Sequence, residues 1–310
     1  MLSASRLLGR PVRFSIVVVT YNRRELLRRC LSAATAQNYP DYEVIVVDDG
    51  STDGSDAMIR EQFPHVRCLA HRANQGEPAS RNLGVEAATG DVIAFTDDDC
   101  VPPADWLRRH AAHYGDPHIG AAGGPQVYHA PSFYDRFDTM QYAVRYERLE
   151  TVARVQRFEH LLTGNLSVRR EVIERVGGFD ERFVTSCDAD LIRRISRAGY
   201  QFVRDPDLMV DHWKTYGLGS YVRMRFHRGC GAVLTDLKDG TLSPRRFVPL
   251  FNVARTWRNW RDYQHRFGGG AATCVAFWGL AFVARWVDVA GRLYYLAVSR
   301  RRRGDARTIK

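Results

Sequence analysis

The 310-residue sequence lacks several patterns that would assign it to a common class at once. Its six cysteines are scattered and form no Cys-x-x-Cys pair, which argues against a zinc or disulfide framework and favours reduced thiols in a cytosolic compartment. The basic N-terminal segment MLSASRLLGRPVR has no apolar run of the kind that marks a signal peptide. No internal repeat stands out, and 45% of the residues are hydrophobic. We therefore expect one large domain, or one domain with an appendage.

The turn after the first expected strand contains no glycine. Its sequence, TYNRREL, differs from the Gly-rich turn that lets the backbone of a Rossmann dehydrogenase approach a pyrophosphate. The Walker pattern is also absent from the sequence. A dinucleotide-binding enzyme is therefore disfavoured, and so is a nucleotidyltransferase with a Gly-rich, Arg- and Lys-containing signature in this turn.

Charge is distributed unevenly along the chain. Residues 213–310 contain 19 Lys and Arg against 5 Asp and Glu, whereas the first 212 residues contain 26 against 30. The basic C-terminal third predicts an anionic partner, such as lipid headgroups, nucleic acid or a phosphorylated substrate. A nucleic-acid partner would not explain the acidic cluster described below, and we do not expect one.

The first hundred residues alternate apolar runs with segments of helical periodicity. Strands are expected at 14–19, 43–47, 66–70 and 92–96, with helices between them, as at 78–89. Strands separated by helices of this length pair in parallel through right-handed crossovers. The sequence therefore predicts an α/β fold in which ligands bind at the carboxyl ends of the strands.

The pattern after residue 115 is less regular. A helix is expected at 132–150, and an amphipathic helix at DADLIRRISRAG, residues 188–199. Two short strands follow, at YQFVRD and LMVDH.

The segment GDVIAFTDDDCVPP places three carboxylates, Asp97, Asp98 and Asp99, at the end of the fourth strand. Residues i and i+2 of an extended segment point the same way, so we expect Asp97 and Asp99 to face one site and Asp98 the other side. Two oxygen donors facing a cleft suit Mg²⁺ or Mn²⁺ that also holds phosphates. A solvated acidic turn is the alternative interpretation of the triplet alone.

Six blocks of sequence cover roughly residues 14–212. In order they are VVVTYNRRELLRRCL, VIVVDDGSTDGS, NQGEPASRNLG, FTDDDCVPP, GNLSVRREVIERVGGFDERF and DADLIRRISRAGY. Together, in this order, they resemble family 2 glycosyltransferases of the GT-A fold. The resemblance implies a Rossmann-like, mostly parallel sheet flanked by helices. It also implies a nucleotide-sugar donor, a divalent metal, Mn²⁺ or Mg²⁺, and inversion at the anomeric carbon.

The resemblance carries site residues onto matching positions of this chain. The nucleotide-sugar-binding residues that it implies are Thr20, Tyr21, Glu25, Asp48, Asp49, Arg81, Asp97 and Asp98. The metal ligands that it implies are Asp99 and His212, the latter in the segment VDHW. A simple Asp-Gly turn for Asp49, a solvated helix arginine for Arg81 and a structural histidine for His212 remain alternatives.

The catalytic base implied by the family's Glu-Asp-x-Asp-Leu segment is Asp188. Here the segment is CDADL, so Cys187 stands where the family has a glutamate, and a carboxylate that could orient the acceptor is missing. Asp190 suits a helix N-terminus, where the helix dipole favours an acid. Gly164, Asn165 and Asp190 are expected on the acceptor side, although a plain turn explains Gly164 and Asn165 equally well.

The resemblance therefore implies an inverting glycosyltransferase that moves a sugar from a nucleotide-diphosphate sugar to an acceptor hydroxyl. We expect a glycan or lipid-linked acceptor, in the synthesis of a cell-surface or secreted glycan. The alternative, motivated by Cys187, is a non-catalytic protein of the same fold that binds a nucleotide sugar or a glycan.

We expect a catalytic domain at residues 12–215 and a basic, partly apolar helical region at 216–310. Residues 271–284 are apolar, which is short for a membrane span of about 20 residues. Trp and Tyr follow, and then the basic run SRRRR at 299–303. We expect an interfacial helix pair or hairpin that anchors the protein peripherally at an anionic inner membrane face. A helical pair buried within the domain is the alternative.

Overall fold

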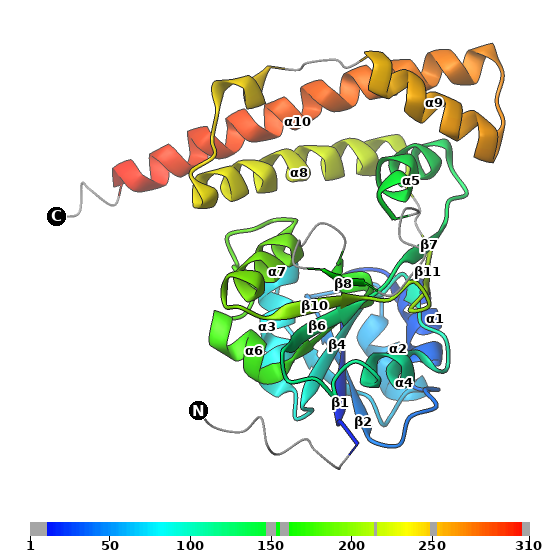
Figure 1. Cartoon of the computed structure of the whole chain (residues 1–310), viewed down its shortest axis with the longest axis vertical. Helices are drawn as coiled ribbons and strands as arrows, with labels where there is room; N and C mark the ends of the chain where they lie inside the picture. The colour runs from blue at the N-terminus through cyan, green and yellow to red at the C-terminus, as the bar shows by residue number, and fades with distance from the viewer. Residues whose placement is uncertain (1–10, 147–152, 156–160, 214–215, 249–252, 306–310) are drawn as a thin grey trace. The chain divides into compact units, whose positions relative to one another are not determined.

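The computed structural model describes residues 11–146, 153–155, 161–213, 216–248 and 253–305. The chain divides into two units (Figure 1). The N-terminal unit holds residues 1–129, 146–181 and 187–214, and the C-terminal unit holds residues 130–145, 182–186 and 215–310. The sequence predicted a single boundary near residue 215, whereas two segments from the middle of the chain also belong with the C-terminal helices.

Parallel strands form the first half of the main sheet. They are β1 (Phe14–Thr20), β2 (Tyr42–Asp48), β3 (Arg67–Ala70) and β4 (Val92–Asp97), in the spatial order β3-β2-β1-β4. The connecting helices are α1 (Arg24–Ala34), α2 (Ser55–Gln62) and α3 (Glu77–Ala87). Because β1 and β4 are buried on both faces, their sequences are continuous apolar runs rather than alternating ones. The predicted alternation of strands and helices is confirmed.

The second half of the main sheet is mixed. β9 (Leu166–Arg169) pairs antiparallel with both β4 and β6 (Ile119–Gly123). β10 (Gln201–Arg204) pairs parallel with β6, and β8 (Ala153–Val155) lies antiparallel at the edge. In the described residues the sheet has eight strands in the order β3-β2-β1-β4-β9-β6-β10-β8. This mostly parallel sheet with flanking helices is the predicted α/β architecture, similar to the GT-A fold.

A small second sheet follows directly from the end of β4. Its strands are β5 (Cys100–Val101), β11 (Val210–Trp213) and β7 (Gln126–His129), in the order β5-β11-β7. The register sets His212 opposite Cys100, one residue beyond the acidic triplet. Short elements complete the unit: α4 (Trp106–Ala111), the 3₁₀ turn η2 (Thr163–Asn165), α6 (Arg170–Val176) and α7 (Cys187–Arg197).

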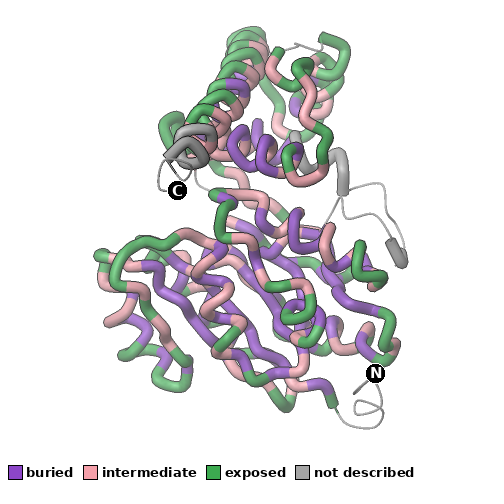
Figure 2. The backbone as a smooth tube through the Cα atoms, turned by 90° about the vertical axis from the view of Figure 1, so that its left-hand side faces the viewer, coloured by how far each residue is buried: buried purple, intermediate pink, exposed green. Residues whose placement is uncertain are grey.

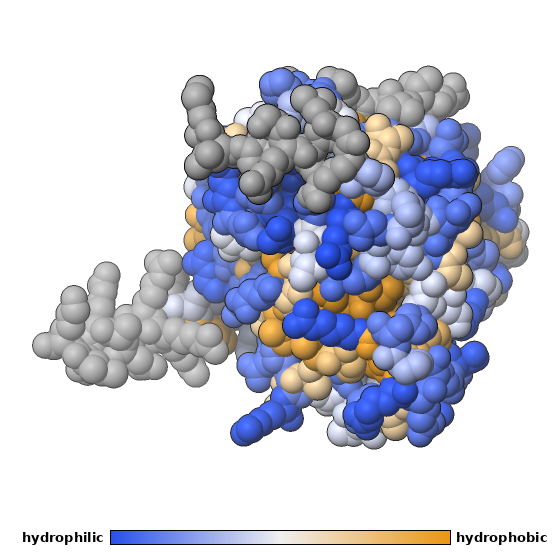
Figure 3. Space-filling model, turned by 90° about the horizontal axis from the view of Figure 1, so that it is seen from below, coloured by the Kyte–Doolittle hydropathy of each residue, from blue (hydrophilic) through white to orange (hydrophobic). Residues whose placement is uncertain are grey.

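The core of the N-terminal unit lies along the strands and the inner faces of their helices. Figure 2 shows the buried residues, in purple, running along this sheet. The face of α1 predicted from helical spacing is the one that packs inward, with Leu27, Cys30, Leu31 and Ala34 buried. On the outside, hydrophilic residues cover most of the described surface on the face in Figure 3, around one apolar area. All six cysteines are free thiols, as predicted.

The C-terminal unit is helical. It contains α5 (Phe133–Tyr146), α8 (Leu218–Asp239), the 3₁₀ turn η3 (Pro244–Phe247), α9 (Val253–Phe267) and α10 (Ala271–Asp305). Its core is largely aromatic and joins these helices through Phe137, Tyr221, Trp260, Tyr263 and Phe277. Residues 147–150 of the helix predicted at 132–150 lie outside the described part of the chain.

The sequence analysis expected a helix pair or hairpin in this region, whereas α10 is one continuous helix of 35 residues. Two of its charged residues pair with residues of the neighbouring helix α8. Asp288 pairs with Arg225, and Arg292 donates to Asp236 at 3.2 Å. The two helices pack closely, since a Cβ at Gly291 would collide with the backbone carbonyl of Phe226.

Candidate active site

The carboxyl ends of β1, β2 and β4 bring the predicted donor-site residues together. The parallel register sets Thr20 opposite Asp48 and Val19 opposite Asp97, so the three strands end at one edge of the sheet. An acidic edge of this kind is where an α/β sheet binds its ligand. The sequence prediction therefore placed these residues on the correct side of the sheet.

Asp48 and Asp49 shape the loops at this edge. Asp48 accepts a hydrogen bond from the backbone N–H of Ser51 at 2.8 Å. Asp49 accepts from the backbone N–H groups of Gln75 and Gly76, at 2.8 and 2.9 Å. Both carboxylates are buried, and Asp49 thereby ties the end of β2 to the start of α3. Their proposed contact with a nucleotide stays a prediction.

The acidic triplet does not follow strand alternation as predicted. β4 ends at Asp97, and Asp98 and Asp99 form a turn, so the i, i+2 rule does not apply to them. Asp97 Oδ1 accepts from Arg81 at 2.9 Å, and Asp99 Oδ1 lies 3.0 Å from His212 Nε2. Asp98 turns inward and accepts from the Thr20 hydroxyl at 2.8 Å.

Arg23 is a residue that the sequence analysis missed. Its Nη1 lies 3.0 Å from Asp98 Oδ1 and 3.2 Å from Asp99 Oδ2, so one guanidinium offsets part of the repulsion between two carboxylates. The turn that delivers Arg23 contains Asn22 in a left-handed conformation, with φ of 53°. Burial raises the pKa of Asp98 to about 7, with Arg23 opposing the rise and Asp99 adding to it.

Asp99 and His212 form a pair of donors that fits a divalent metal. His212 Nδ1 lies 2.9 Å from Gln126 Oε1, an acceptor that suits a proton on Nδ1, and Nε2 faces Asp99. Two acceptors 3.0 Å apart need a proton or a cation between them. This separation is close to the roughly 3 Å between adjacent ligands of an octahedral ion with bonds of about 2.1 Å. Carboxylate and imidazole are also ligands that Mn²⁺ accepts.

Cys100 lies beside this pair without the chemistry of a third ligand. The ligand atoms of Asp99, Cys100 and His212 all lie within 4.8 Å of one another. Burial, with the nearby charge of Asp99, raises the pKa of the Cys100 thiol well above its ordinary value. A protonated thiol is a poor ligand for a hard cation, so Asp99 and His212 stay the predicted metal ligands.

Gly164 sits where only glycine fits. A Cβ there would collide with the Gln126 amide and lie 2.9 Å from Asp97 Oδ2. Its neighbour Asn165, predicted on the acceptor side, is fully buried. The Asn165 amide accepts from Trp106 at 2.8 Å and donates to the carbonyls of Pro125 and Leu208. These contacts give Asn165 a structural role, and its place on the acceptor side stays a prediction.

Asp188 lies in the first turn of α7. Its Oδ1 accepts from the backbone N–H of Ala189 at 2.8 Å, and its electrostatic neighbours include Arg81, Asp97 and the backbone amide of Thr163. Burial raises the pKa of Asp188, although Arg81 opposes the shift. A carboxylate with a raised pKa is a stronger base than an exposed one. The geometry thus suits the predicted role.

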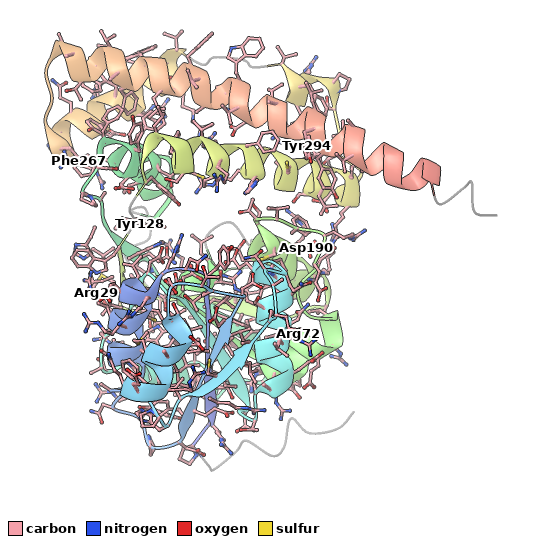
Figure 4. The ribbon with its side chains drawn as sticks, turned by 180° about the vertical axis from the view of Figure 1, so that it is seen from behind. Arg29, Arg72, Tyr128, Asp190, Phe267 and Tyr294 are labelled. Atoms are coloured by element: carbon pink, nitrogen blue, oxygen red, sulfur yellow. The ribbon has the colours of Figure 1, made fainter. Side chains whose placement is uncertain are left out.

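Three other predicted residues have different surroundings. Asp190, labelled on α7 in Figure 4, is buried. It accepts from Arg194 at 2.8 Å, one turn along α7, and Arg194 in turn donates to the carbonyl of Val176. This ion pair gives Asp190 a structural role, and its place on the acceptor side stays a prediction. Glu25 lies on the exposed side of α1, 3.1 Å from Arg28, and Tyr21 is 47% exposed at the strand end.

The missed residues share one cause. Arg23 contacts Asp98, Glu77 contacts Arg81, and Gln126 contacts His212. Two of these three contacts join segments that are distant in sequence. The unbalanced charge of three adjacent carboxylates was the available signal for Arg23. No sequence signal pointed to Gln126.

The fold and this acidic strand edge define an α/β enzyme site for a nucleotide-linked substrate. The family model described as glycosyl transferase family 2 matches residues 15–177. The chain belongs to this family, and it is a glycosyltransferase that transfers a sugar from a nucleotide-sugar donor. The non-catalytic alternative raised by Cys187 is therefore not favoured.

Curated relatives and solved structures agree with this assignment. The chain is 31% identical over 247 residues to glycosyltransferase AglE of Haloferax volcanii, covering 76% of this chain and 78% of the relative. It is 26% identical over 219 residues to the glucosyl-dolichyl phosphate glucuronosyltransferase of the same organism, covering 65% and 69%. Mannosyltransferase PcManGT from Pyrobaculum calidifontis, solved with GDP-Man and Mn²⁺, superposes with a TM-score of 0.62 at 21% identity, over 93% of this chain and 88% of that chain. That structure supports the fold.

Proposed function

We propose that this enzyme transfers a sugar, with inversion, from a nucleoside-diphosphate sugar to an acceptor hydroxyl at an anionic membrane surface. The observation that carries the proposal is the arrangement at the strand edge. Asp99 and His212 form a pair of metal donors 3.0 Å apart, and Asp188 shares the electrostatic surroundings of Asp97 and Arg81. A metal site for a diphosphate beside a general base is what a single displacement at an anomeric carbon needs.

Asp99 and His212 would hold the divalent metal, Mn²⁺ or Mg²⁺. When bound, the metal supplies charge neutralisation for the departing nucleoside diphosphate. Asp188, in the first turn of α7, accepts the proton of the acceptor hydroxyl. Arg81, held against Asp97 at 2.9 Å, adds a buried positive charge beside the anionic donor. Tyr21, exposed at the end of β1, is placed to contact the donor nucleotide.

The acceptor that we propose is a glycan or a lipid-linked sugar, used in the synthesis of a cell-surface or secreted glycan. The relative named glucosyl-dolichyl phosphate glucuronosyltransferase supports the lipid-linked choice. The C-terminal unit supports it independently, because its surface suits a membrane.

Helix α10 presents an uncharged stripe to its surroundings. Every exposed residue between Ala271 and Ser299 is apolar or glycine, spaced three or four apart, and the larger ones are Val275, Phe282, Val283, Trp286, Leu293 and Tyr294. The stripe from Ala272 to Ala297 is about 38 Å long. The charged residues of this stretch are less exposed, and Asp288 and Arg292 pair with α8. An apolar outer face backed by charge pairs suits lipid better than water.

We propose that α10 lies in the plane of an anionic bilayer, with this stripe buried in the interface. By length and composition Ala271–Ser299 is also long enough to cross a membrane. Its opposite face packs on α8, however, and α8 carries charged residues that a spanning helix would take into the hydrocarbon core. The +14 charge of residues 213–310 favours anionic lipid. The side chains of Arg300 to Arg303 lie outside the described residues.

Vesicle sedimentation tests the membrane proposal. The protein should sediment with anionic vesicles at low salt, and high salt should release it only partly, because salt screens charge and leaves apolar burial intact. Burial of one large apolar side chain contributes about 1.5–3 kcal/mol, so a variant with Val283→Glu and Trp286→Glu should lose at least about tenfold in vesicle affinity. Met209→Glu, at a 49%-exposed position of the N-terminal unit, is the control. Wild-type protein that ignores the vesicles, or equal release by the control, would contradict the proposal.

A thermal-shift screen tests the donor proposal. We expect one or a few nucleotide-diphosphate sugars to raise the melting temperature with Mn²⁺ present, and to do so much less in EDTA, because ligand binding stabilises the folded state by mass action. GDP-mannose belongs in the panel because it is bound in the superposed mannosyltransferase. A chain that responds to no nucleotide sugar, or equally with and without metal, would not fit the proposal.

A further inference from the structure

Arg81 is surrounded by three groups from three elements. Its Nη2 lies 2.9 Å from Asp97 Oδ1 on β4 and forms an ion pair with Glu77 on its own helix, α3. Its Nη1 donates to Cys187 Sγ, at the start of α7, at 3.3 Å. The guanidinium is only 4% exposed and also lies 5.5 Å from the centre of the Phe179 ring. A cation buried this deeply needs its anionic partners in place.

Cys187 supplies no charge to this cluster. Its side chain is buried, and burial raises the pKa of the thiol far above its ordinary value, so it is a neutral thiol. The position immediately before Asp188 therefore carries no carboxylate in this chain. The two carboxylates that contact Arg81 come from β4 and α3 instead.

Glu77 reaches Arg81 because the two residues lie four apart on one helix face. α3 begins at Glu77, so this carboxylate also sits at the positive end of the helix dipole. It is 43% exposed, whereas Arg81 is enclosed, so Glu77 meets the guanidinium from the solvent side. Asp188 and Asp97 are among its electrostatic neighbours.

We propose that Glu77 is a positioning residue for sugar transfer, which supplies from α3 the carboxylate that is missing at position 187. It holds Arg81 between Asp97 on the donor side and Asp188 on the α7 side, and it limits how strongly the buried cation attracts Asp188. The inference rests on the proposed role of Asp188 as the base. Beyond that role, the inference states that a carboxylate is needed against Arg81 and that it can come either from α3 or from position 187 on α7.

Glu77→Gln tests the first half of this proposal, because it removes the charge and keeps the shape. We expect turnover to fall about tenfold, the lower end of the range for a charged hydrogen bond, since Glu77 is 43% exposed. Glu86→Gln, at an exposed position of the same helix, should change turnover less than twofold. Glu77→Asp, which keeps the charge on a shorter side chain, should retain more activity than Glu77→Gln.

Relocation of the carboxylate tests the second half. In the Glu77→Gln background, Cys187→Glu should restore turnover to within about threefold of wild type. In the wild-type background, the same change places a third carboxylate against Arg81, and we expect turnover to fall. A substitution that helps in one background and harms in the other identifies a shared role, which a merely structural contact would not produce.

Urea unfolding of the four proteins separates this inference from the proposed function. The free energies of unfolding should show the same coupling between positions 77 and 187, whether or not the right donor has been found. If wild type turns over no nucleotide sugar, the proposed function fails and the unfolding cycle still decides the inference. Additive effects of the two substitutions on stability and on turnover, or a Glu77→Gln variant with wild-type turnover, would overturn it.

Discussion

Replacement of Asp188 by asparagine should lower turnover by about 10²–10⁴-fold while donor affinity stays near that of wild type. General base catalysis contributes roughly this factor, and asparagine keeps the shape of the side chain without its basicity. The asparagine oxygen can also still accept the hydrogen bond that Asp188 receives from the N–H of Ala189. Single-turnover kinetics and a donor titration with the same nucleotide sugar measure the two quantities separately.

The pH dependence of the wild-type enzyme follows from the same residue. Burial raises the pKa of Asp188, so its carboxyl group is protonated at a higher pH than an exposed aspartate. Turnover should therefore decline on the acid side as the base is lost, and the decline should begin above the usual range of an aspartate. Asp188→Asn should remove this acid limb.

Asp190→Asn is the matched control on the same helix turn. Because Asp190 is buried against Arg194, its replacement should cost stability and leave the chemical step largely intact at a temperature where the variant is folded. Near-normal turnover in Asp188→Asn, together with a severe loss in Asp190→Asn, would move the base to Asp190.

Asp99→Asn should abolish the metal-dependent part of donor binding while the protein stays folded. Loss of a residue that merely supports a metal ligand costs about 10–100-fold in affinity, so loss of a ligand should cost at least as much. The fold should persist because Asp99 is one of the like charges that raise the pKa of Asp98, and its removal relieves that repulsion. Calorimetric titration with Mn²⁺, and with donor in the presence of Mn²⁺ or EDTA, provides the readout.

Asp211→Asn is the comparison for this experiment. Asp211 precedes His212 on β11, but it is exposed and lies 2.7 Å from His129. It should leave the affinity for Mn²⁺ unchanged, whereas His212→Gln should weaken it as Asp99→Asn does. Donor affinity and turnover in EDTA equal to those with Mn²⁺ would remove the metal assignment.

The sequence was sufficient for the features that depend on local pattern. The apolar runs of β1 and β4 and the helical spacing of Leu27, Cys30 and Leu31 reflect burial that any compact arrangement would require. Block order then indicated the GT-A fold, and the strand ends located the acidic edge. These inferences hold because parallel strands connected by helices have few topologies.

The inferences that failed depended on tertiary neighbours. Strand alternation was extended through Asp98 and Asp99, but the small sheet begins at Cys100 and forces a turn there. A helix pair or hairpin was expected where α10 is one helix, and its Asp288 and Arg292 pair with α8 residues more than 50 positions away. The contacts that bury Asn165 could not be foreseen for the same reason, since its three hydrogen-bond partners come from residues 106, 125 and 208.

The division of the chain into two units with alternating segments limits how this protein can evolve. Residues 130–145 and 182–186 belong to the C-terminal unit, so the polypeptide passes from one unit to the other five times. Phe137 and Met140 of α5 pack against Tyr221 and Phe277 of the later helices. A gene truncated near codon 215 would still encode α5, but without the partners that bury its aromatic face. The helical unit is therefore not a detachable module, and recombination that exchanges C-terminal ends between relatives must also match two internal segments.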